Sequence, residues 1–348
     1  MLKILGENRY MAILFIDKSR HVKNFPKISM VIPTRNRPEF LANLLFSILK
    51  QTTLPYEVLV VDDSDDTKTE ELLKYLDHAF LNRGIVLRHL PGNKKNMSIS
   101  NARNTGVEAS NGEIIFFVDD DVILEKRYIE EILKVYDTHP MAKGVQGFIV
   151  NLPFNPLNIR HLIFNSMNKI FLLDHYEKNK CSRQRGLCYP YSPAGIIECG
   201  WLHGSNMSIK REVFENFRFD DYYTLKGRSI GEDVRLTSKI NSSFPHSLFM
   251  NPKAKVCHIR FPRKIDKYSI YSINVYFFYR FITAHERTFK NMALAFWKLL
   301  GRLIVPGIYF LFSKNVHELF WLIKSYLFAI NHLNDVKKGD FRFISFLH

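Results

Sequence analysis

The distribution of hydrophobic positions from residue 28 onward predicts strands that alternate with helices. Four short, mainly apolar runs lack the regular polar alternation of a sheet with one wet face; they are 28–34, 57–63, 85–90 and 113–119. Such runs are typical of parallel strands that are buried on both faces. They predict an α/β fold with a mostly parallel, Rossmann-like central sheet and helices on both faces.

Apolar residues with helical spacing fill the intervals between these runs. The first helix is predicted after Pro38, because proline is favoured at the first helical position. The leucines of 67–76 predict a second helix. A third is expected over 98–110, with Ser98 or Ser100 as its N-cap.

The second half of the chain has a more mixed pattern. Residues 151–200 are rich in Asn, Pro, Tyr and Arg and are expected to be irregular, and loops of that length are usually functional or mobile. Further strands are predicted at 144–150, 203–209 and 253–259.

The C-terminal region, 266–348, is aromatic, basic and helical over 268–330. Its longest apolar run, 303–312, is interrupted by Pro306 and Gly307 and is shorter than the roughly 20 residues that a spanning helix needs. The pattern favours amphipathic helices that associate with a membrane surface. The alternative is a helical appendage that packs on its own domain or on a partner subunit.

The chain is strongly basic, with 49 Lys and Arg against 34 Asp and Glu and a net charge of +15 over 348 residues. This excess favours partners that carry phosphate. No sequence signature of a DNA- or RNA-binding module is found, so we expect no nucleic-acid partner. Residues 1–18 lack the pattern of a secretory signal, and the four cysteines form no CxxC pair. We therefore expect a cytoplasmic protein, peripheral on the cytoplasmic face of the membrane.

Three adjacent acids, Asp119, Asp120 and Asp121, follow the fourth predicted strand. Neighbouring carboxylates repel one another unless their pKa values rise or a cation lies among them. Mn²⁺ and Mg²⁺ bind carboxylate oxygens, and Asp119 and Asp121 point the same way if the strand continues. The alternative is a solvated acidic turn, or an N-cap for a helix over 125–133.

A second acidic strand end contains Asp62 and Asp63. Either carboxylate could accept hydrogen bonds from a nucleobase or a ribose hydroxyl, or could cap the next helix. Arg103 lies on the helix that leads toward the third acidic strand end, where it could reach a base, a phosphate or a carboxylate.

Taken together, the segments 29–52, 57–66 and 98–121 resemble the family-2 glycosyltransferases of GT-A fold. The resemblance covers 28–260 approximately. It implies an inverting, metal-dependent enzyme that moves a sugar from a nucleotide-diphosphate sugar, most commonly a UDP-sugar, to a hydroxyl of a glycan or lipid-linked acceptor. It divides the chain into an N-terminal extension, a nucleotide-sugar-binding half, an acceptor-binding half and the C-terminal helical region, with the bounds 1–27, 28–125, 126–265 and 266–348.

The same resemblance implies roles for residues at the strand ends. Asp121 corresponds to the metal ligand and Asp119 to the ribose-side acid, which is the second candidate ligand. Asp120 corresponds to a bystander or outer-shell group near the nucleotide sugar. The other implied nucleotide-sugar-binding residues are Pro33, Thr34, Arg35, Asp63 and Arg103.

In the acceptor half, the segment "GEDVRL" resembles the acidic pair that carries the general base of the family. It implies Asp233 as the base, with Glu232 as the fallback, although two acids at a helix start also act as caps. His258 resembles a metal-binding histidine, against the alternative of a core histidine. Trp201 and His203 are candidates for the acceptor site. Three basic residues would flank the diphosphate or form a solvated turn: Arg260, Arg263 and Lys264.

Two other function classes stay open from the sequence. A nucleotidyltransferase is also α/β and metal-dependent, but the segment after the first strand, "PTRNRP", lacks the glycines such enzymes usually carry there. The second class that stays open is a non-catalytic subunit of a membrane glycan-synthesis complex. Because no motif of a processive polymerase is found, transfer of single sugars is favoured. The sugar, the acceptor and the oligomeric state are not specified by the sequence.

Overall fold

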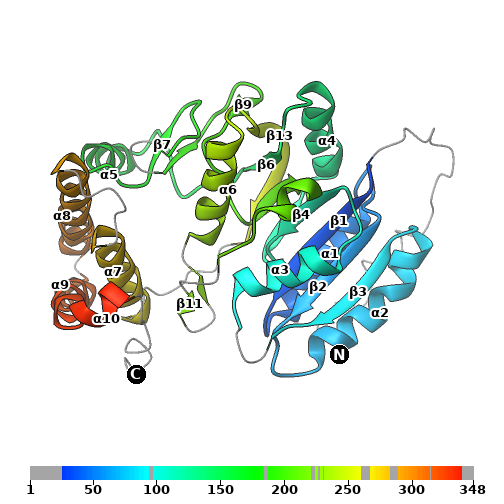
Figure 1. Cartoon of the computed structure of the whole chain (residues 1–348), viewed down its shortest axis with the longest axis horizontal. Coiled ribbons are helices and arrows are strands. Elements are labelled where there is room, and N and C mark those ends of the chain that lie inside the picture. The colour runs from blue at the N-terminus through cyan, green and yellow to red at the C-terminus, as the bar shows by residue number, and fades with distance from the viewer. Residues whose placement is uncertain are drawn as a thin grey trace.

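The computed structural model describes most of the chain, and a nine-stranded sheet flanked by helices forms its centre (Figure 1). The described residues are 26–93, 97–183, 187–220, 224–225, 228–229, 231–259, 267–282, 289–313 and 315–338. The predicted N-terminal extension, 1–27, lies almost wholly outside these ranges, as do Arg260, Arg263 and Lys264.

The first half of the sheet has the predicted parallel arrangement, with the strand order β3-β2-β1-β4. The elements are β1 (Ile28–Thr34), α1 (Pro38–Leu49), β2 (Glu57–Asp62), α2 (Lys68–Asn82), β3 (Val86–Pro91), α3 (Ile99–Ala109) and β4 (Ile114–Val118). β2 and β4 are buried throughout, and β1 nearly so. β3 is partly exposed, with Val86 45% exposed, so the prediction of a strand covered on both faces was wrong there. The reason is that β3 is the edge strand.

Helix α3 begins and packs as the sequence requires. The predicted N-cap Ser98 is confirmed, since its Oγ accepts a hydrogen bond from the amide of Asn101 at 3.0 Å. One turn from Arg103, Gly106 lies against β1: a Cβ at this position would lie 2.2 Å from Cγ1 of Val31. Only glycine permits so close an approach. The N-terminal turns of α3 are thereby held at the carboxyl ends of the strands.

The second half of the sheet adds β5 (Val122–Leu124), β6 (Gly144–Ile149), β10 (Asn206–Lys210) and β13 (Leu248–His258), with the helices α4 (Tyr128–Thr138) and α6 (Glu232–Ser243). β10 runs antiparallel between β4 and β6, which interrupts the parallel order. β13 pairs in parallel with β6 and antiparallel with β5. The last pairing sets His258, at the end of β13, opposite Val122, directly after the three aspartates.

The segment 151–200 is more ordered than the sequence indicates. The prediction of an irregular loop was wrong for α5 (Ile159–Ile170), whose N-cap Asn158 accepts from the amides of Arg160 and His161. The helix buries none of its residues fully. Short elements occupy part of the rest of this region and the stretch before α6: β7 (His175–Glu177), β8 (Cys188–Pro190), β9 (Ile197–Glu198), the 3₁₀ helix η2 (Arg211–Glu215), β11 (Thr224–Leu225) and β12 (Arg228–Ser229).

The C-terminal region forms a separate group of helices beside α5, away from the parallel half of the sheet (Figure 1). Its members are α7 (Lys267–Ile282), α8 (Phe289–Phe312), α9 (Val316–Asn331) and α10 (Leu333–Lys338). α7, α9 and α10 share a small core that contains Val275, Ala329 and Val336. On α8, Trp297 stacks on Phe171 and donates from Nε1 to the carbonyl of Ile170 at 2.7 Å. The appendage thus packs on its own chain.

Helix α8 continues through Pro306 and Gly307 and has 24 residues, so it is longer than the apolar run of 303–312 on which the sequence argued against a spanning helix. Proline removes one backbone donor, which a helix tolerates when its neighbours hold it in place. By length and composition, α8 is the one helix in the described part of the chain that could cross a membrane, and 28% of its most apolar window is buried inside the protein.

Candidate active site

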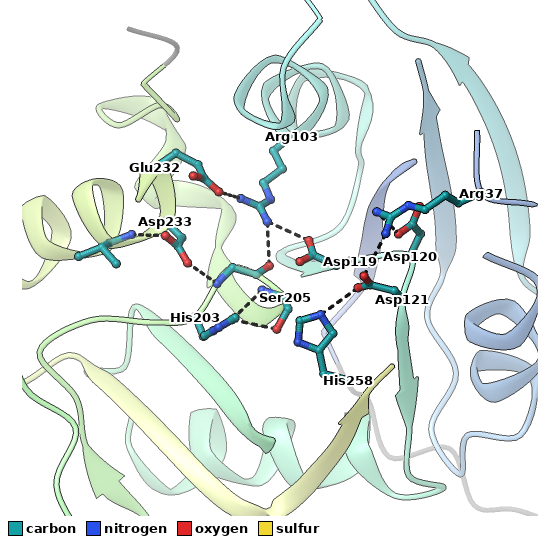
Figure 2. A network of polar contacts seen from close by, with 12 residues as sticks. Arg37, Arg103, Asp119, Asp120, Asp121, His203, Ser205, Glu232, Asp233 and His258 are labelled. Atoms are coloured by element: carbon teal, nitrogen blue, oxygen red, sulfur yellow. Dashed lines mark hydrogen bonds and ion pairs between the residues drawn. The ribbon is translucent and has the colours of Figure 1, made fainter. Parts of the chain in front are cut away.

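The three aspartates occupy the turn between β4 and β5, and each has different surroundings (Figure 2). Asp119 is partly exposed, whereas Asp120 and Asp121 are buried. The strand ends before them, so a turn, and not the alternation of a continuing strand, sets the directions of Asp119 and Asp121.

Asp120 points toward the end of β1. Its Oδ2 accepts a hydrogen bond from the hydroxyl of Thr34 at 2.8 Å, and its Oδ1 lies 2.7 Å from Nη2 of Arg37. Burial raises the pKa of Asp120 to about 7, although Arg37 and Thr34 favour the charged form. Asp120 therefore links the turn to Thr34 at the end of β1 and to Arg37.

Asp121 lies between two basic side chains. Its Oδ1 is 3.0 Å from Nε2 of His258, and its Oδ2 accepts from Nη1 of Arg37 at 3.0 Å. Burial alone would raise the pKa of Asp121, but the hydrogen bonds and charges of His258 and Arg37 lower it overall. The amide of Ile259 also donates to the carbonyl of Asp121 at 2.7 Å, so strand pairing holds this geometry.

Asp119, Asp121 and His258 together could hold a metal ion. One ligand atom from each lies within 4.8 Å of the others. Two carboxylate oxygens and an imidazole nitrogen suit Mn²⁺, and the oxygens suit Mg²⁺. The residues present therefore fit a divalent cation.

Arg103 is the central cation of the site and is 1% exposed. Its Nη1 donates to Oε1 of Glu232 at 2.7 Å, while its Nη2 donates to Oδ1 of Asp119 at 3.0 Å and to the carbonyl of Gly204 at 3.1 Å. Burial alone would lower the pKa of Arg103, but the charges of Asp119 and Glu232 raise it overall. The sequence left a base, a phosphate or a carboxylate open as the partner of Arg103. In the structure its side-chain partners are the carboxylates of Glu232 and Asp119.

The acidic pair "ED" forms the first turn of α6, where the helix dipole favours negative charge. Glu232 is buried and faces Arg103, whereas Asp233 is partly exposed and its Oδ2 accepts from the amide of Gly204 at 2.7 Å (Figure 2). Burial and the neighbouring charge of Asp233 raise the pKa of Glu232 to about 7, against the effect of Arg103. The two acids thus have separate surroundings.

A cavity of about 770 Å³ adjoins the metal cluster, and Asp233, His203 and Trp201 line it. The ring of His203 lies 6.4 Å from that of His258, so His203 lies between the cluster and the cavity. Trp201 is 5% exposed, and its Nε1 donates to the carbonyl of Cys188 at 3.3 Å. Trp201 therefore belongs to the cavity wall and also to the core.

The residues implied in nucleotide binding lie at the ends of β1 and β2. Arg35 is exposed, and its Nη2 lies 3.4 Å from Asp65 of the neighbouring loop. Asp63 is buried at the end of β2, where a Cβ on Gly92 would lie 1.9 Å from its Oδ1. Pro33 and Thr34 complete this edge of the sheet. The structure therefore brings the ends of β1 and β2 together at one edge of the sheet.

Arg37 is the site residue that sequence reasoning missed. It bridges Asp120 and Asp121 with ion pairs of 2.7 and 3.0 Å. The available signal was the second arginine of "PTRNRP", directly before the proline that starts α1. Its partners follow it by more than 80 residues, so no local pattern could identify them.

Comparison with known proteins agrees with this geometry. The family model described as "Glycosyl transferase family 2" matches residues 29–216. The glucosyl-dolichyl phosphate glucuronosyltransferase of Haloferax volcanii is 31% identical over 69% of this chain and 71% of its own length. The minor teichoic acid biosynthesis protein GgaB of Bacillus subtilis is 28% identical over 62% of this chain, but this match spans only 21% of GgaB.

A solved structure shows the same fold. The mannosyltransferase PcManGT from Pyrobaculum calidifontis, in complex with GDP-Man and Mn²⁺, aligns with 93% of this chain and 84% of its own, with a TM-score of 0.51 and 14% sequence identity. The fold is thus the predicted GT-A fold, with a C-terminal helical appendage. The chain belongs to glycosyltransferase family 2 and is a glycosyltransferase.

Proposed function

We propose that the chain is an inverting glycosyltransferase that moves a single sugar from a nucleotide-diphosphate sugar to a hydroxyl of a glycan or lipid-linked acceptor. Asp233 takes the hydroxyl proton while the acceptor oxygen bonds to the anomeric carbon. The bond from that carbon to the diphosphate oxygen breaks, and its electron pair leaves with the diphosphate. The position of Asp233 carries the proposal, because it is the carboxylate of the acidic pair that faces the cavity.

In this proposal Glu232 is a positioning residue. Its carboxylate is committed to Arg103, and Arg103 in turn holds Asp119 and the carbonyl of Gly204. The same glycine donates its amide to Asp233. The network therefore fixes the base relative to the acidic turn.

Asp119, Asp121 and His258 would hold Mn²⁺ or Mg²⁺, which supplies positive charge to the departing diphosphate. Arg37 stabilises Asp121 and Asp120 from the side opposite His258. The nucleotide would lie along Pro33, Thr34, Arg35 and Asp63, with Asp119 toward its ribose. UDP is the proposed nucleotide, because it is the commonest donor carrier of the family.

We assign binding of the two substrates to different halves of the domain. Residues 28–125 would bind the nucleotide sugar and 126–265 the acceptor, and the acidic turn and the pair at the start of α6 face each other across that division. The names of the two relatives, one a teichoic acid biosynthesis protein and the other a glucosyl-dolichyl phosphate glucuronosyltransferase, support a glycan or lipid-linked acceptor.

We further propose that the C-terminal region, 266–348, associates with the cytoplasmic face of a membrane. Large apolar side chains are exposed on neighbouring elements: Leu157 and Ile159 near α5, Phe289, Phe296 and Phe312 on α8, and Val316, Phe320 and Leu327 on α9. Amphipathic helices with such faces bind at the interface between headgroups and acyl chains. Co-sedimentation with phosphatidylglycerol vesicles that is lost on replacing Phe296, Phe312 and Phe320 by Ser would support this surface.

The proposed reaction is tested by a thermal-shift screen of nucleotide sugars with Mn²⁺ or Mg²⁺, because a ligand that binds only the folded state raises its melting temperature. We expect a metal-dependent shift with a UDP-sugar and release of free nucleoside diphosphate with acceptor present. Release of pyrophosphate would instead indicate nucleotidyl transfer. Donor and metal binding without any transfer or donor hydrolysis would indicate a non-catalytic subunit.

A further inference from the structure

Residues of the C-terminal helices form part of the lining of the cavity beside Asp233. Ile273, Tyr276 and Phe277 of α7 line it, as do Lys298 and Arg302 of α8. The cavity thus extends from the acidic pair of α6 to the appendage, so α7 and α8 form a wall of the space next to the proposed base.

Arg302 is the unusual residue of this wall. Its guanidinium carbon lies 3.1 Å from the centre of the Phe277 ring, and its Nε is buried without a hydrogen-bond partner among the described residues. It forms no ion pair with any carboxylate in the described part of the chain. Burial lowers the pKa of Arg302, and the charge of Asp174 offsets this only in part. Arg302 is half-buried in the cavity wall, and a buried Nε that lacks a partner among the described residues is costly, so an oxyanion that accepted from it would be well bound there.

The charges around the cavity also favour an anion. Arg183, Arg235, Lys298 and Arg302 line it, against the carboxylates of Asp174 and Asp233, and of these cations Arg235 also pairs with Asp220 at 3.6 Å. Lys298 precedes Arg302 by four residues on α8, so both lie on the same face of the helix. A planar guanidinium and a nearby ammonium are the groups that proteins use to bind phosphate oxygens.

Resting on the proposed function, we propose that Arg302 and Lys298 bind a phosphate group of the acceptor, so that the acceptor is a phosphorylated glycan or a glycosyl lipid phosphate. This phosphate is not transferred. It anchors the acceptor at the appendage end of the cavity while the acceptor hydroxyl lies at Asp233. The donor diphosphate would lie elsewhere, beside the divalent cation that Asp119, Asp121 and His258 would hold.

Calorimetry on the full chain in EDTA tests this subsite without metal at the donor site. The probes are glycerol 3-phosphate and farnesyl phosphate, with glycerol and farnesol as neutral counterparts. We expect both phosphates to bind and Arg302→Gln to weaken both at least tenfold, since hydrogen bonds to charged groups have about this effect. Lys290→Gln, which removes a charge from an exposed position on the same helix, should leave both affinities unchanged.

The two probes distinguish the source of the phosphate. Tighter binding of farnesyl phosphate than of glycerol 3-phosphate indicates a lipid phosphate, and comparable binding indicates a phosphorylated glycan. Equal binding by wild type and Arg302→Gln, equal binding of glycerol and its phosphate, or no phosphate binding at millimolar concentration would each overturn the subsite.

The metal-dependent thermal shift with nucleotide sugar separates this proposal from the one it rests on. Arg302→Gln should retain that shift, which also shows that the variant is folded. If wild type lacks the shift with every donor, the proposed function fails whatever the phosphate result. If the shift is present but phosphate binding does not depend on Arg302, only the subsite fails.

Discussion

Arg103 and Glu232 are 129 residues apart in the chain, yet Nη1 of Arg103 lies 2.7 Å from Oε1 of Glu232 in the buried centre of the site. This ion pair joins α3 of the parallel half of the sheet to the start of α6. The same guanidinium also donates to Asp119 and to the carbonyl of Gly204. One hydrogen-bond network therefore joins the acidic turn after β4, the acidic pair of α6 and the segment before β10 (Figure 2).

Replacement of Arg103 by Met should destabilise the protein by about 3–5 kcal/mol, because it leaves buried carboxylates without their counter-charge. Equilibrium unfolding in urea measures the loss. The double variant Arg103→Met/Glu232→Gln should lose less than the sum of the two single variants, since contacting residues couple. Additive losses of stability would show that Arg103 and Glu232 do not stabilise the protein through their contact.

Replacement of Asp121 by Asn should abolish the thermal shift caused by Mn²⁺ and should weaken metal binding at least about 100-fold, beyond the 10–100-fold effect typical of outer-shell partners. His258→Ala should act in the same direction, because its Nε2 belongs to the same cluster. Thr34→Val removes only the hydrogen bond to Asp120 and serves as the control, with a smaller effect. A normal Mn²⁺ response in Asp121→Asn would place the ion elsewhere.

Replacement of Asp233 by Asn should lower kcat by about 10²–10⁴-fold, the usual contribution of a general base. Since Asp233 lines the cavity and does not belong to the metal cluster, the donor-induced thermal shift should persist. Steady-state kinetics at saturating donor measures the effect. Glu212→Gln removes a surface carboxylate paired with Lys143 and should leave turnover unchanged. Near wild-type turnover in Asp233→Asn would remove Asp233 from the role of base.

Glu57 should contribute a pH-dependent part of the stability. Burial alone would raise the pKa of Glu57, but hydrogen bonds from Ser29, Asn111 and Arg88 lower it below its ordinary value of 4.5. A lowered folded-state pKa means that this stabilisation is present above pH 4.5 and is lost as the pH falls through the folded-state value.

The free energy of unfolding of Glu57→Gln should therefore fall short of wild type near pH 7, and the gap should narrow in acid. Urea titrations at several pH values measure this gap. Glu70→Gln, an exposed pair with Lys74 on α2, provides the comparison and should show little effect. A gap that is constant with pH would contradict the assignment to ionised Glu57.

Gly106→Ala should destabilise the protein by about 1–3 kcal/mol, because the new methyl group would overlap Val31 on β1. Trimming the facing residue in Gly106→Ala/Val31→Ala should recover part of this loss relative to the sum of the two single changes. Thermal or urea unfolding checks the comparison. If the two changes simply added, the packing of α3 on β1 would not be the cause.

Much of the first half of the fold was predictable from sequence. The strands at 28–34 and 57–63, the helix after Pro38 and the Ser98 cap are all confirmed, to within a residue at their ends. These features depend on residues close together in the chain. The resemblance of the ordered motifs to family-2 glycosyltransferases also predicted the fold and the class of enzyme correctly.

The errors occurred where local patterns are weak or are overridden by packing. Helix α5 has no fully buried residue, and the composition of 151–200, rich in Asn and Pro, favoured a loop instead. Helix α8 contains Pro306 but continues through it beside α5, α7 and α9. Arg37 gave no sign of its role, because its carboxylate partners follow much later in the chain.

The amino-acid sequence by itself determined the order of strands and helices in the first half of the chain, the clustering of acids at strand ends and the family, because periodicity, capping and motif spacing are local properties. Only the tertiary structure decided the partner of each acid. Asp120 pairs with Arg37, Asp121 with His258 and Glu232 with Arg103, whereas Asp233 lines the cavity. Those assignments depend on contacts between strands and helices distant in sequence, and the burial that those contacts create raises the pKa of Asp120 and Glu232.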